Sequence, residues 1–106
     1  MATDDLLYVV GWDGGQVVKI DLATGTASTI TTIREALLDG VVLLDDGSLL
    51  VSSAGGSAIY RVQPNGVKAV LFDNLSAPAD IGYDVGRALL LIPLLDANQV
   101  LAKPMP

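Results

Sequence analysis

The stretch LLYVVGWDGGQVVKI, residues Leu6–Ile20, decides the fold because its layout returns twice more along the chain. An apolar run of strand length is followed by a Gly-rich turn and a second apolar run. LLVSSAGGSAIYRV (Leu49–Val62) and LLLIPLLDANQVLAK (Leu89–Lys103) share this layout. The copies follow one another at about 40 residues, a period typical of β-propeller blades, in which each repeat is a four-stranded antiparallel meander.

Alignment of the three segments predicts which residues occupy equivalent positions. The first strands contribute Val9, Val51 and Ile92, and the second strands contribute Val17, Ile59 and Val100. We expect all six side chains to be buried between neighbouring blades.

Turn signals such as DGG (13–15) and PNG (64–66) separate ten apolar runs of strand length. The expected strands lie near residues 6–12, 16–21, 26–31, 40–44, 48–53, 57–62, 67–72, 80–84, 88–93 and 98–102. Their short connections favour antiparallel pairing. The sequence therefore predicts an all-β fold, a partial β-propeller of about two and a half four-stranded blades. One helical turn within 31–40 stays open, because Thr32, Glu35 and Gly40 form a start and stop pattern.

We expect one half-propeller domain with a partial blade over 1–32, a full blade over 33–73 and a partial blade over 74–106. The runs LLYVV and ALLLIP are apolar on both faces, as in sheets that are covered on both sides. The two end blades would leave more apolar surface open than the few hundred Å² usual for a soluble monomer. The chain is therefore expected to be either a fragment without a function of its own or a homo-oligomer, most simply a dimer that closes a six-bladed ring.

Composition excludes several classes of function. The chain has no Cys and no His, so thiolate chemistry and the commonest general base are absent. Its formal net charge is −6, and its six basic residues are scattered, which argues against nucleic-acid binding. We see no signal peptide and no membrane-spanning segment, so we expect a soluble, cytoplasmic protein as encoded and no membrane partner.

Two longer stretches carry a resemblance to a known family. LLDGVVLLDDGSLLVSSAGGSAIYRV (37–62) and APADIGYDVGRALLLIPLLDANQVLAK (77–103) resemble the gluconolactonase/regucalcin-like family, also called senescence-marker-protein-like. Its members are six-bladed propellers related to NHL-repeat proteins. The likeness covers nearly the whole chain, which looks like the C-terminal half of such a propeller. Its most specific part is PADIGYD (Pro78–Asp84).

The resemblance implies a site on the propeller axis. Enzymes of the family hydrolyse sugar lactones or related esters with one divalent cation, held by a Glu, an Asn and an Asp. The Asp stands in a P-D-G-like turn and is also the catalytic base, so LDG (38–40) places Asp39 at the catalytic and metal-binding position. Hard oxygen ligands suit Ca²⁺ or Mg²⁺. The blade and the strand that would carry the Glu and the Asn are not in this sequence.

Other candidate residues have a structural alternative beside the functional one. Asp80 is a candidate second metal ligand or a cap on its strand, and Asp39 can equally be a turn residue before Gly40. Trp12 and Asp13 are candidate ligand contacts on a blade-end loop, although Trp12 can also pack between blades. Ser52 and Ser53 lack a His and a nucleophile elbow, which argues against a serine hydrolase.

These observations favour a self-assembling half-propeller scaffold or binding module without intact family catalysis or a required cofactor. The alternative is a metal-dependent lactonase or esterase whose site is rebuilt on an oligomer axis from Asp39 and Asp80 of each subunit.

Overall fold

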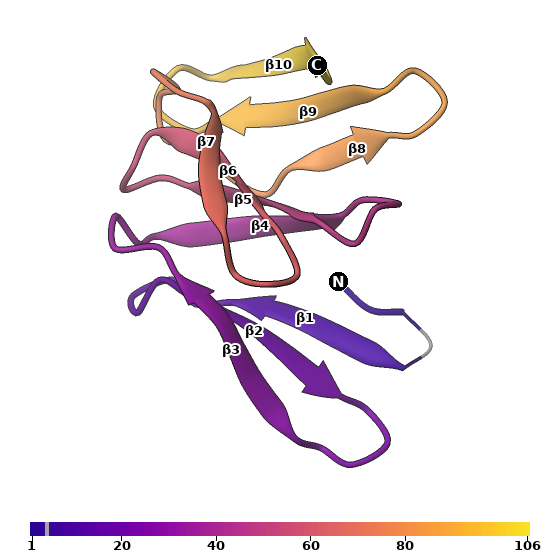
Figure 1. The fold of residues 1–106 in the computed structure, drawn as a ribbon. Coiled ribbons are helices and arrows are strands. Elements are labelled where there is room, and N and C mark those ends of the chain that lie inside the picture. The colour runs from indigo at the N-terminus through magenta and orange to yellow at the C-terminus, as the bar shows by residue number, and fades with distance from the viewer. Residues whose placement is uncertain (4) are drawn as a thin grey trace.

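The computed structural model describes residues 1–3 and 5–106, and its strands form three antiparallel sheets that follow one another along the chain (Figure 1). The first sheet has the order β1-β2-β3, with β1 Leu6–Val10, β2 Gln16–Asp21 and β3 Ala27–Thr32. The second has the order β4-β5-β6-β7, with β4 Leu38–Leu43, β5 Leu49–Ser53, β6 Ala58–Val62 and β7 Lys68–Phe72. The third has the order β8-β9-β10, with β8 Gly82–Asp84, β9 Leu89–Leu94 and β10 Gln99–Pro104.

All ten predicted strands are present, and each begins and ends within two residues of its expected bounds. The all-β prediction is confirmed, since the described residues contain no helix. The numbers of strands, three, four and three, match one complete four-stranded meander between two partial ones.

The helical turn left open over 31–40 was the wrong alternative. Ala36 and Leu37 have φ angles of 56° and 50°, in the left-handed region that a right-handed helix excludes. A turn replaces the helix, closed by the Ala36 N–H that donates to the Ile33 carbonyl at 3.0 Å. The helical alternative does not form because the backbone here turns between β3 and β4 through left-handed residues.

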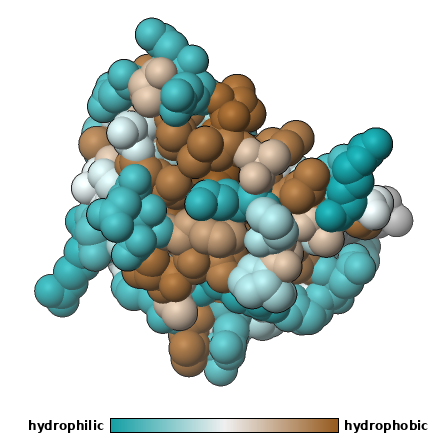
Figure 2. All heavy atoms as spheres, turned by 90° about the horizontal axis from the view of Figure 1, so that it is seen from above, coloured by the Kyte–Doolittle hydropathy of each residue, from teal (hydrophilic) through white to brown (hydrophobic). Residues whose placement is uncertain are grey.

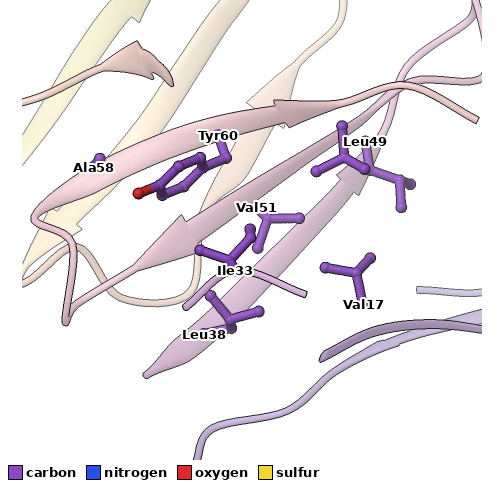
Figure 3. Close-up of a cluster of buried hydrophobic side chains, with 8 residues drawn as sticks. Val17, Ile33, Leu38, Leu49, Val51, Ala58 and Tyr60 are labelled. Carbon is purple, nitrogen blue, oxygen red and sulfur yellow. The ribbon is translucent and has the colours of Figure 1, made fainter. Parts of the chain in front are cut away.

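The first and second sheets pack together through an apolar cluster, which we call the first junction. Val17 of β2 and Ile33 of the β3–β4 loop are completely buried against side chains of β4, β5 and β6, among them Val51 and Tyr60 (Figure 3). Tyr8 and Val10 of β1 pack on the same cluster.

The second junction repeats the first between the second and third sheets. Leu50 and Ile59 from the second sheet are completely buried in one cluster with Leu90 and Ile92 of β9. Because both faces of the middle sheet are covered, every residue of β5 is buried.

Four of the six residues predicted to be buried are completely buried: Val17, Val51, Ile59 and Ile92. The prediction is wrong for Val9, which is 41% exposed, and for Val100, which is 68% exposed. Val9 pairs with Val18 on the face of the first sheet that points away from the second, while Val10 and Val17 face inward. Val100 pairs with Pro93 on the corresponding outward face of the third sheet, while Leu101 and Ile92 face inward. Both residues are exposed because no further sheet of the described chain covers these faces.

The backbone conformation of the turns repeats along the chain together with the sequence. Gly15, Ser57 and Asn98 occupy equivalent turn positions, and their φ angles are 67°, 52° and 52°. The Gly15 carbonyl accepts a hydrogen bond from Ile33 N–H at 2.7 Å, and the Ser57 carbonyl accepts one from Leu75 N–H at 2.9 Å. The same geometry therefore joins the first sheet to the second and the second to the third.

Candidate axial site

The candidate site lies where the inner strands β4 and β8 come into contact. Asp39, the second residue of β4, is exposed, and Gly40 after it is buried. A Cβ atom on Gly40 would lie 2.5 Å from the Ile81 nitrogen and 3.1 Å from the Asp80 Cα, so only glycine allows this approach. The chain therefore passes from Asp39 directly into contact with the segment that contains Asp80.

A serine of the adjacent strand fixes this contact. Ser52 of β5 is completely buried, and its Oγ accepts a hydrogen bond from Gly40 N–H at 2.8 Å and donates one to the Ala79 carbonyl at 2.7 Å. One hydroxyl thus joins β4 to the segment before β8 and satisfies two backbone groups. The sequence identified Ser52 only as an improbable nucleophile. Its partners are 12 and 27 residues away, so no local pattern pointed to its role.

Asp39 and Asp80 are accordingly held at the starts of neighbouring inner segments, and both are exposed. Across residues 1–3 and 5–106, no three His, Cys, Asp or Glu residues gather closely enough to hold a metal ion. A cation bound by Asp39 and Asp80 would need further oxygen ligands, from backbone carbonyls, from solvent or from another chain, because Ca²⁺ takes about six to eight.

Trp12 and Asp13 lie in the β1–β2 turn, and both are exposed. The Trp12 carbonyl accepts a hydrogen bond from Leu37 N–H at 2.7 Å, which ties this turn to the entrance of β4. The junction contact comes from the backbone, and the Trp12 side chain is 48% exposed. Gly15 completes the turn where a Cβ atom would lie 2.1 Å from the Ile33 carbonyl oxygen.

The loops at this end of the molecule form one connected surface, which we call the loop surface: residues 11–15, 33–37, 54–57, 73–81 and 95–98 together with Asp39. Backbone hydrogen bonds join its neighbouring loops, including Ala54 N–H to Leu37 C=O at 2.9 Å and Leu95 N–H to Ala77 C=O at 3.0 Å. Its exposed charged residues are Asp13, Arg34, Glu35, Asp39, Asp73, Asp80 and Asp96. The loop surface is therefore strongly acidic, and it would repel anionic ligands.

A second polar group lies at the edge of this surface, where the first two sheets meet. A Cβ atom on Gly56 would lie 3.0 Å from the Tyr60 hydroxyl and 3.2 Å from Ser53 Oγ. Burial raises the pKa of the Tyr60 hydroxyl, and the negative charge of Glu35 raises it further. Ser53 Oγ donates to the Ala36 carbonyl at 2.6 Å and accepts from Gly56 N–H at 2.9 Å, so this hydroxyl is already engaged in a structural role.

No helix of the described residues is long and apolar enough to cross a membrane. No protein-family model matches the chain, and no curated protein matches it.

Several solved structures are similar to it. A streptogramin B lyase aligns with a TM-score of 0.68 and 12% identity over 99% of this chain and 39% of its own. The virginiamycin B lyase of Staphylococcus aureus aligns with a TM-score of 0.67 and 14% identity over 100% of this chain and 40% of its own. A chain of the nidogen/laminin complex aligns with a TM-score of 0.64 and 17% identity over 92% of this chain and 43% of its own.

These similarities establish the fold, a partial β-propeller, and the chain spans about two fifths of the length of these structures.

Proposed function

We propose that the chain is a self-assembling half-propeller, a scaffold or binding module that associates with a second copy through the outward faces of its first and third sheets. The observation that carries this proposal is the exposure of apolar side chains on both of these faces, among them Val9 on the first sheet at 41% and Leu91 and Val100 on the third sheet at 37% and 68%. The middle sheet, covered on both sides, shows how such faces are buried within the chain.

Binding accounts for the site residues better than catalysis does. Asp39 and Asp80 are two exposed carboxylates without a third acidic or imidazole group gathered beside them in the described part of the chain. The similar structures include lyases and a chain from a protein–protein complex, so this fold is compatible with either role. A histidine-to-alanine variant of virginiamycin B lyase is described as catalytically inactive. These 106 residues contain no His, so they cannot supply an equivalent histidine.

The test is whether thermal stability depends on protein concentration. Because association stabilises the folded chain by mass action, the melting temperature should fall as the protein is diluted from about 100 μM to 1 μM. Light scattering on the same samples should give about twice the chain mass of 11.0 kDa at the higher concentration. A compact monomer with an unchanged melting temperature would contradict the proposal.

A second candidate function is a metal-dependent lactonase-type hydrolase, as in the gluconolactonase-like family. The contact between Gly40 and Asp80 favours it, because that contact places two carboxylates on neighbouring inner segments. A dimer would bring four such carboxylates to one axis, where like charges favour cation binding.

Calorimetric titration of Ca²⁺ into wild type and Asp39→Asn separates the two candidates. The scaffold proposal predicts no heat of binding in either protein. Binding tighter than about 100 μM that Asp39→Asn abolishes would favour the hydrolase, since weak protein sites for Ca²⁺ lie at or above that value.

A further inference from the structure

We propose that the two copies join head to tail: the outward face of β1–β3 in one copy packs on the outward face of β8–β10 in the other, with Val9 opposite Val100. This inference rests on the proposed self-assembly and specifies the partner and the contact. It follows from the way in which the chain builds its own two junctions.

Each internal junction uses the same two repeat positions. At the first junction, Val17 of β2 and Val51 of β5 belong to one cluster. At the second, Ile59 of β6 and Ile92 of β9 belong to one cluster. In both cases the residue from the earlier sheet lies on the second strand of the repeat (β2 or β6). Its partner in the next sheet lies on the first strand of the repeat (β5 or β9).

Two of the six aligned repeat residues take no part in these junctions. Val100 is at the position of Val17 and Ile59, and Val9 is at the position of Val51 and Ile92. Val100 is on the face of the third sheet that would meet a following sheet, and Val9 is on the face of the first sheet that would meet a preceding one. The chain therefore carries both halves of one more junction, on opposite sides of the molecule (Figure 1).

The composition of the two faces fits such a junction. Cross-strand partners share a face, so the pairs Leu7–Ile20, Val9–Val18 and Val18–Thr29 place no charge on the outward side of these strands. The charged Lys19 and Asp21 of β2 pair with Tyr8 and Leu6 on the other side.

The outward face of the third sheet is also mainly apolar. Its pairs include Leu91–Ala102, Pro93–Val100 and Leu89–Pro104. Asp84, which pairs with Leu89, is at its margin and forms an ion pair with Arg87 at 2.9 Å. In the view from the side of β10, hydrophobic residues gather across the middle of the surface and most hydrophilic residues lie around them (Figure 2).

A second copy is the occupant that this pattern specifies. A partner with one apolar face would cover one sheet and leave the other open. A second copy presents both complementary faces, so a twofold dimer forms two identical junctions and leaves neither face exposed. Six sheets would then surround one axis, and the dimer would contain two identical junctions.

Site-directed cross-linking tests this arrangement, and the absence of Cys from the sequence makes every introduced thiol unique. Val9→Cys and Val100→Cys are purified separately, mixed, and treated with a bis-maleimide that spans about 10 Å, the usual separation of packed sheets. Val67→Cys replaces one partner as the control, because Val67 is an exposed loop residue at 55%. Total mass is measured in parallel by light scattering.

Head-to-tail packing predicts that the Val9→Cys and Val100→Cys mixture cross-links at least about tenfold more than either variant with Val67→Cys, since the packed faces hold the thiols within reach. Equal yields in a protein of dimeric mass would overturn this arrangement and leave the self-assembly proposal standing. Preferential cross-linking of Val9→Cys to itself would also overturn it, in favour of like faces meeting. A monomeric mass would overturn both proposals, and the outward faces would then belong to contacts with other blades or another protein.

Discussion

Replacement of Ser52 by alanine should weaken the contact between the second and third sheets and lower the stability of the protein. The side chain is completely buried, and its Oγ serves Gly40 N–H at 2.8 Å and the Ala79 carbonyl at 2.7 Å. Alanine leaves both backbone groups without this partner. Each buried polar group that loses its hydrogen bond costs about 1–3 kcal/mol, so we expect Ser52→Ala to lower the free energy of unfolding by about 2–4 kcal/mol.

Urea unfolding followed by circular dichroism measures this loss, at a fixed protein concentration so that association contributes equally to each variant. The matched control is Ser28→Ala, since Ser28 is an exposed residue of β3 and should change stability by less than about 0.5 kcal/mol. If Ser52→Ala were as harmless as Ser28→Ala, the hydroxyl would not hold the two sheets together, and the placement of Asp39 beside Asp80 would lose its physical basis.

Three further predictions concern the inner edge, the core and the buried phenol. Gly40→Ala should destabilise the protein by about 1–3 kcal/mol in the same unfolding assay, because its Cβ would lie 2.5 Å from the Ile81 nitrogen; an unchanged midpoint would show that the contact is loose. Val51→Ala should cost about 1–3 kcal/mol since Val51 is completely buried, and a negligible loss would mean that the middle sheet is not the core. The pKa of Tyr60 is raised, so the folded protein holds the phenol proton more tightly than the unfolded chain does. The stability that this proton contributes should be fully present below pH 10 and lost as the pH rises through the folded pKa. Phenolate absorbance should show Tyr60 ionising at lower pH after Glu35→Gln, and an unchanged titration would mean that Glu35 does not act on it.

The sequence predicted the strands well because their signals are local. Apolar runs and turn residues such as those at 13–15 determine where each strand begins and ends, and the repeat of about 40 residues places equivalent strands in successive sheets. The burial of Val17 and Ile59 followed from the same repeat. The exposure of Val9 and Val100 did not, because burial also depends on whether a neighbouring sheet is present.

The candidate site was less accessible to sequence reasoning. Asp39 and Asp80 could be identified from a family resemblance, but the close approach at Gly40 and the hydrogen bonds of Ser52 depend on contacts between distant segments. A start and stop pattern over 31–40 left a helix open as an alternative, although the left-handed backbone at Ala36 and Leu37 was decided by the reversal between two sheets. Short-range propensities are weak wherever such tertiary geometry is decisive.

Native mass spectrometry of the chain at micromolar concentration tests directly whether two copies form a closed dimer. In a closed head-to-tail dimer, both outward faces of each copy are buried. This arrangement therefore predicts one dominant species at twice the 11.0 kDa chain mass. A single species at the monomer mass, or a ladder that continues to three, four and more copies, would contradict a closed half-propeller dimer.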